Sequence, residues 1–209
     1  LEKEITYPAA VDIVNFCYES ESLDNLYCGL LERTPGTNEI DNYFQKPINS
    51  ATSKISGYDI EMNYSIETDF GTFAPRLIAT YLDNREKNDT GFAEDHKVHT
   101  GEQDRPRWKA RFITNYSYED LSLALTVAYR HATVDDNEWN IEDNDYNEIP
   151  SYTTVDLTGR YNITDELEVR AGVLNLFDRE PPRNPFAYDE GQYYDMLGQR
   201  ITLGVNYKF

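Results

Sequence analysis

The sequence has no long hydrophobic run and few basic residues. Its 209 residues nowhere reach the about 18 to 20 consecutive apolar positions of a membrane-spanning helix, so a helical membrane protein is excluded. Nineteen Lys and Arg stand against 38 Asp and Glu, and the resulting net charge of -19 would repel the phosphates of nucleic acid. A membrane protein built from β-strands is not excluded, because the hydrophobic signal of each strand is weak and polar loops dilute it further.

Strict alternation of apolar and polar residues marks the last twelve positions, GQRITLGVNYKF. A period of two indicates a strand with two unlike faces. The apolar parity is occupied by Ile201, Leu203, Val205, Tyr207 and Phe209.

The same alternation recurs along the chain. It is clear at positions 57–66, 72–81, 108–116, 121–130, 154–161 and 167–173, and weaker from Asn38 to Ile48. One such segment alone would suit a half-buried strand of a soluble sandwich. These alternations instead run for about ten residues, with aromatic residues near their ends, as in membrane barrels. The pattern predicts an all-β protein with about eight strands able to cross a bilayer when tilted.

The connections between the expected strands fall into two length classes. ETDFG, YED and NITDE are tight, whereas the connections from Asn84 to Arg105, Ala132 to Ile149 and Arg179 to Met196 are long and polar. This division is typical of short periplasmic turns and long external loops.

The polar positions of the strands hold more basic than acidic residues, although the whole chain is acidic. A barrel of eight strands fills its interior with side chains, whereas a wide barrel can turn many charges toward water or a plug. We therefore favour a wide barrel. The inward row holds Arg76, Lys109, Arg111, Arg130, Arg160, Arg170, Arg200 and Lys208 against Asp59, Glu61, Asp156 and Glu168.

Several motifs carry a family resemblance. The stretch VDLTGRYNITDELEVRAGVLNLFDREPP contains Asn175-Leu176-Phe177-Asp178, and it is followed by Gly198-Gln199-Arg200 and a terminal Phe209. Together with Tyr58-Asp59-Ile60-Glu61 and Pro106-Arg107-Trp108, it resembles the carboxy-terminal strands of TonB-dependent outer-membrane receptors.

The resemblance implies an antiparallel transmembrane β-barrel segment, about eight strands of a 22-stranded barrel, in the bacterial outer membrane. It implies a receptor for energy-coupled uptake of a scarce solute, such as a siderophore, a cobalamin-like molecule or a carbohydrate. Expected partners are outer-membrane lipid, the barrel-assembly machinery, which would read Phe209 as its signal, the TonB complex and an unknown small ligand. We expect no enzymatic activity, no cofactor, no metal site and no nucleic acid.

The amino-terminal residues differ from the rest. The chain opens on Leu1 without a signal peptide, and no plug domain or TonB box is recognisable, so we expect a piece of a longer protein. We divide it into a disulfide-bearing, partly helical connection at residues 1–37 and barrel strands with long external loops at residues 38–209.

A short helix is expected within that connection. Helical spacing starts at Leu23 with Ser22 as a plausible N-cap, and Pro35-Gly36 would end it. Counting strands back from a periplasmic carboxyl terminus places the connection on the periplasmic side.

Cys17 and Cys28 are the only two cysteines. In an exported chain they suggest a disulfide, while free thiols and a metal site stay open as alternatives. Zinc would need more ligands, and the three histidines lie far away in the sequence.

Aromatic residues in the long loops are candidates for ligand contact, since aromatic rings suit sugars, aromatic chelators and cobalamin-like faces. These residues equally suit packing within the loops. An alternative function is a small, complete outer-membrane barrel with an enzymatic or structural role. The candidate ligand-binding residues are Trp139, Tyr146, Tyr152, Phe186, Tyr188, Tyr193 and Tyr194.

Overall fold

The computed structural model describes residues 4–89, 95–139, 146–183 and 193–209. The chain forms two compact units: unit 1 comprises residues 1–54 and 86–98, and unit 2 comprises residues 55–85 and 99–209. No helix among the described residues is long and apolar enough to cross a membrane.

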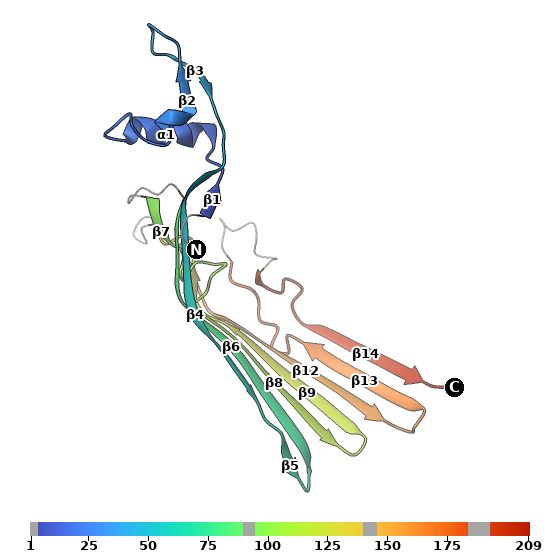
Figure 1. Ribbon diagram of the computed structural model, residues 1–209. Helices are drawn as coiled ribbons and strands as arrows, with labels where there is room; N and C mark the ends of the chain where they lie inside the picture. The colour runs from blue at the N-terminus through green and yellow to red at the C-terminus, as the bar shows by residue number, and fades with distance from the viewer. Residues whose placement is uncertain (1–3, 90–94, 140–145, 184–192) are drawn as a thin grey trace. The chain divides into compact units, whose positions relative to one another are not determined.

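Unit 2 is built on an antiparallel sheet of long strands (Figure 1). Its strand order is β4-β6-β8-β9-β12-β13-β14, and each strand therefore pairs with the next long strand in the sequence. The short strand β5 (Ile66–Thr68) pairs with the start of β6. The long strands are β4 (Ile48–Asn63), β6 (Gly71–Asn88), β8 (Trp108–Tyr118), β9 (Leu121–Arg130), β12 (Tyr152–Asn162), β13 (Leu167–Leu174) and β14 (Arg200–Tyr207).

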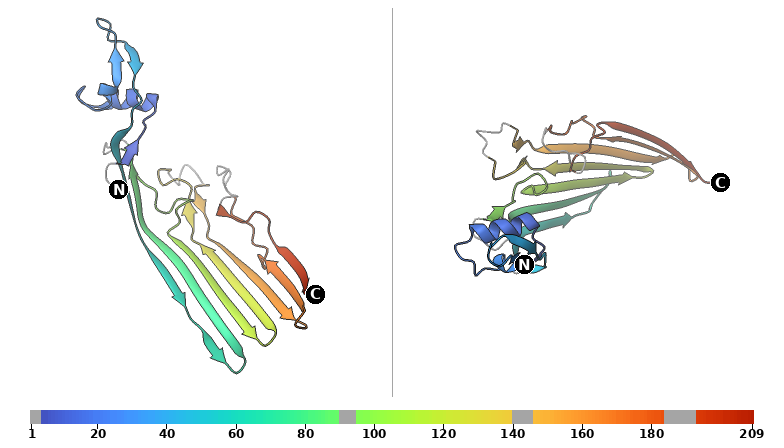
Figure 2. Two further views of the ribbon diagram at one scale, coloured as in Figure 1. Left: turned by 45° about the vertical axis from the view of Figure 1, so that its right-hand side comes forward. Right: turned by 90° about the horizontal axis from the view of Figure 1, so that it is seen from above.

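Short and long connections alternate, as expected from the sequence. Because the paired strands are antiparallel, the three short turns lie at one end of the sheet and the long connections start from the other (Figure 2). Gly71 shows why a turn needs glycine: its φ is +118°, and an added Cβ would lie 2.6 Å from the carbonyl oxygen of Ser117. Within the long connections, β10 (Thr133–Val134) pairs with β11 (Glu148–Ile149).

The strand register separates the side chains into two faces. On β8 and β9, for example, Phe112 pairs with Val127 and Tyr116 with Leu123, while the alternate pairs, such as Arg111 with Ala128, lie on the other side. Such pairing continues onto β12, β13 and β14, where Val169 pairs with Val205. We call the two sides the apolar face and the polar face.

Unit 1 has its own small core, formed by Ile13, Cys17, Tyr27, Leu30 and Ile48. Its helix α1 (Ala10–Glu19) starts where the Asp12 carboxylate accepts a hydrogen bond from the Ala9 N–H, at 3.2 Å. A short 3-10 turn, η1 (Cys28–Leu30), leads into the hairpin of β2 (Leu31–Arg33) and β3 (Ile40–Tyr43). Two further short strands, β1 (Glu4–Thr6) and β7 (His96–Val98), pair with the start of β4 and the end of β6. The expected disulfide between Cys17 and Cys28 is present and joins α1 to η1.

The helix expected from Leu23 is wrong in position, because the helix ends at Glu19. Leu23 and Leu26 are 77% and 52% exposed, so their helical spacing has no packing partner. The Asn25 side chain instead donates to Ser22 O and accepts from the Cys28 N–H. These hydrogen bonds stabilise a turn at this point in place of a helix.

The strand count behind the expected periplasmic position of the amino-terminal connection is one too high. The segment from Asn38 to Ile48 contributes only the hairpin strand β3 and the first residue of β4, rather than a separate barrel strand. With one strand fewer in the count, β4 starts at the end of the sheet from which the long connections leave. The side of the membrane on which this connection lies stays a prediction.

Candidate functional site

Two rows of aromatic side chains bound the apolar face of unit 2. Toward the long connections, the ring centroids of Tyr81 and Trp108 lie 4.7 Å apart, and Tyr58 stacks on Tyr81 at 6.4 Å. Toward the short turns, Phe73 and Tyr116 lie 4.6 Å apart. From Phe73 to Tyr81 the strand rises about 26 Å, which matches the about 25 Å height of the apolar band of outer-membrane barrels. The apolar face is therefore chemically suited to lipid.

The polar face carries the charged row expected from the sequence. Arg76 Nη2 lies 2.7 Å from Glu61 Oε1, and the neighbouring Thr80 hydroxyl donates to Asp59 Oδ1 at 2.7 Å. On β13, Arg170 pairs with Glu168 at 3.2 Å. The strand register confirms this shared face for Arg76, Lys109, Arg111, Arg130, Arg160, Arg170 and Arg200, whereas Lys208 follows the end of β14.

Arg130, the last residue of β9, joins two of the long connections on the polar face. Its guanidinium donates from Nη2 to the carbonyl oxygen of Gln103. The guanidinium carbon also lies 5.0 Å from the ring centroid of Tyr193 and 5.5 Å from that of Tyr194. Both distances are within the range of cation–π attraction, so Arg130 fixes these segments against the end of the sheet.

A small core surrounds this contact. Tyr152 and Tyr194 are each 6% exposed and pack with Ile149, and their ring centroids lie 5.2 Å apart in an edge-on arrangement. The Tyr152 hydroxyl donates to the carbonyl oxygen of Arg179 at 3.2 Å. Burial therefore makes packing the main role of both tyrosines in this structure.

The other candidate aromatic residues lie elsewhere. Trp139 and Tyr146 are 38% and 57% exposed and lie in the connection between β9 and β12. Phe186 and Tyr188 fall outside the described residues. The structure thus gathers Tyr152, Tyr193 and Tyr194 and leaves Trp139 and Tyr146 accessible.

The motif Asn175-Leu176-Phe177-Asp178 forms a hydrogen-bonded turn at the end of β13, which we call the Asn175 turn. Asn175 is 1% exposed, and its side chain donates to Arg179 O and accepts from the Arg179 N–H at 3.0 and 2.9 Å. The Asn175 N–H donates to Asp156 Oδ1 on β12, at 2.8 Å. Asn175 and Asp178 both have positive φ, 51° and 49°, a conformation that Asn and Asp tolerate better than most residues.

Asp178 connects the Asn175 turn to the residue before β14. Its Oδ1 accepts a hydrogen bond from the Gln199 N–H at 2.8 Å, and the Gln199 side chain donates to Leu176 O at 2.8 Å. The motif therefore fastens the end of β13 to the start of β14.

A second tie holds the segment before β14. Arg200 donates from Nη1 and Nη2 to the two carboxylate oxygens of Asp195, at 2.9 and 2.7 Å. The Leu197 N–H also donates to Asp195, and this bond, followed by those from Arg200, lowers the pKa of the Asp195 carboxyl below its usual value.

Sequence reasoning missed the roles of Arg130 and Asp195. Arg130 appeared only as a member of the charged row, and nothing local in the sequence connects it to Gln103 or to Tyr193. The one signal was its position, because Arg130 is an inward-facing residue at the end of its strand, just before a long loop. Within the described ranges, no group of three or more His, Cys, Asp or Glu residues could hold a metal ion.

Comparison with known proteins gives consistent results. Residues 25–176 match the family described as TonB dependent receptor-like, beta-barrel. The chain is 28% identical over 163 residues to the vitamin B12 transporter BtuB of Vibrio vulnificus, covering 78% of this chain and 23% of that protein. It is 24% identical over 172 residues to the probable TonB-dependent siderophore receptor PiuA of Acinetobacter baumannii, covering 77% of this chain and 21% of that protein. The chain thus spans less than a quarter of the length of these relatives.

Solved structures show the same fold. The crystal structure of the siderophore receptor PiuA from Acinetobacter baumannii has a TM-score of 0.52 and 19% identity, covering 79% of this chain and 23% of that chain. A mutant of the ferric enterobactin receptor PfeA from Pseudomonas aeruginosa has a TM-score of 0.51 and 18% identity, covering 78% and 23%.

Proposed function

The chain belongs to the family of TonB-dependent receptor-like β-barrels, and on this premise we propose that it forms part of a receptor for energy-coupled uptake of a scarce solute. Members of this family are outer-membrane transporters rather than enzymes. The two-faced sheet carries the proposal, because a lipid-compatible face between two aromatic rows and a charged opposite face suit the wall of a water-filled or plugged barrel.

We propose a siderophore, a cobalamin-like molecule or a carbohydrate as the solute. The relatives named above are a vitamin B12 transporter and a probable siderophore receptor, which supports the first two classes. Trp139 and Tyr146 are the candidate contacts that the structure leaves exposed, and Tyr152, Tyr193 and Tyr194 would act by shaping the loops around Arg130.

The proposed partners follow from the same premise. Outer-membrane lipid would cover the apolar face, the assembly machinery would read Phe209, and the TonB complex would act through the remainder of the receptor. Residues 1–37 are proposed as the connection and residues 38–209 as the barrel portion.

The alternative of a small, complete barrel is less well supported. In the described part of the chain the strand order runs from β1 and β4 to β14, and β14 pairs with β13 alone. A complete barrel would close these edges against one another.

Uptake by the full-length receptor tests the proposal. Cells that carry it as their only receptor should accumulate radiolabelled cyanocobalamin or a ferric siderophore, and deletion of the TonB gene should abolish this. TonB-independent accumulation, or none of any ligand in the three classes, would contradict the proposal.

A further inference from the structure

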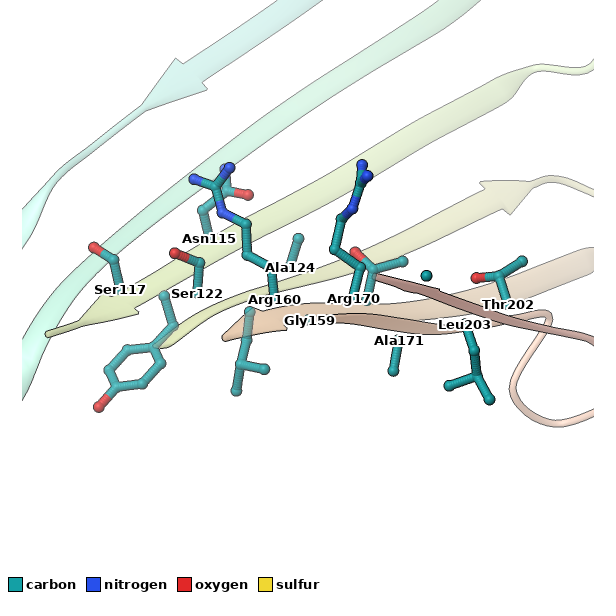
Figure 3. A pocket seen from close by; sticks show the side chains of 14 residues that line it. Asn115, Ser117, Ser122, Ala124, Gly159, Arg160, Arg170, Ala171, Thr202 and Leu203 are labelled. Atoms are coloured by element: carbon teal, nitrogen blue, oxygen red, sulfur yellow. The ribbon is translucent and has the colours of Figure 1, made fainter. Parts of the chain in front are cut away.

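We draw no further inference here: the strongest candidate, the hollow of about 700 Å³ on the polar face into which Arg160 and Arg170 rise from β12 and β13 (Figure 3), carries none because nothing in the structure shows what covers it.

Discussion

The Arg130 guanidinium lies over the Tyr193 ring, 5.0 Å from its centroid, although Arg130 ends β9 and Tyr193 lies in the connection between β13 and β14. The same side chain reaches Gln103 in a third segment. Arg130 therefore acts as a common anchor for segments that no local sequence pattern joins.

Replacing Arg130 by Ala should loosen the segment that leads into β14. Loss of the cation–π contacts costs about 1 kcal/mol, which corresponds to about a fivefold rise in local opening. Trypsin cleavage after the exposed Arg183 in the full-length receptor should speed up by that factor. Arg111→Ala is the matched control, and equal cleavage rates in the two variants would argue against the anchor.

The Asn175 turn should contribute strongly to stability near the end of the barrel. Asn175→Ala loses two side-chain hydrogen bonds and replaces Asn by a residue that tolerates a φ of 51° less well, so we expect a loss of about 2 to 4 kcal/mol. Asn175→Gly loses the same bonds but tolerates the backbone conformation, and it should be the milder change. Denaturant unfolding of the refolded receptor measures both, with the exposed Asn206→Ala as control; a loss below about 0.5 kcal/mol in Asn175→Ala would contradict the account.

The Asp195 tie should depend on acidity. Because its folded pKa is lowered from 3.8, its contribution is fully present above that value and is lost as the pH falls through the folded pKa. The difference in Tm between wild type and Asp195→Asn should therefore be constant from pH 7 down to about pH 5 and shrink below pH 3.8. A difference that grows on acidification would reverse the sign and refute the tie.

Phe209 distinguishes stability from assembly. It is fully exposed and contacts Tyr207 with ring centroids 5.1 Å apart, so its removal should cost at most about 2 to 3 kcal/mol. If the assembly machinery reads it, its deletion should sharply lower the outer-membrane yield in cells while refolding in detergent persists. A normal yield would exclude the signal role, and failed refolding would indicate a structural one.

The sequence predicts the sheet well because its information is local. Each strand alternates its own faces, so Leu123 and Val127 on β9 could be assigned without knowing their partners, and the register with β8 and β12 agrees. The helix failed because the spacing of Leu23 and Leu26 resembles an amphipathic face, while the Asn25 side chain stabilises a turn there.

The contacts around Arg130 were beyond such reasoning for a different cause. Its partners Gln103 and Tyr193 lie far along the chain in loops without a period, and only the folded sheet brings them together. The motif Asn175-Leu176-Phe177-Asp178 was recognisable in the sequence, but the hydrogen bond from Asn175 to Asp156 depends on the pairing of β12 with β13.

Accessibility along β9 tests most directly whether this sheet is the wall of an outer-membrane barrel. Nitroxide spin labels placed singly from Leu121 to Arg130 in the full-length receptor, reconstituted in lipid, would report collisions with oxygen, which dissolves in the bilayer. The account predicts a period of two, with oxygen accessibility high at Leu123, Leu125 and Val127 and low at the intervening Ala124, Thr126 and Ala128. Uniform accessibility, or the opposite parity facing lipid, would contradict it.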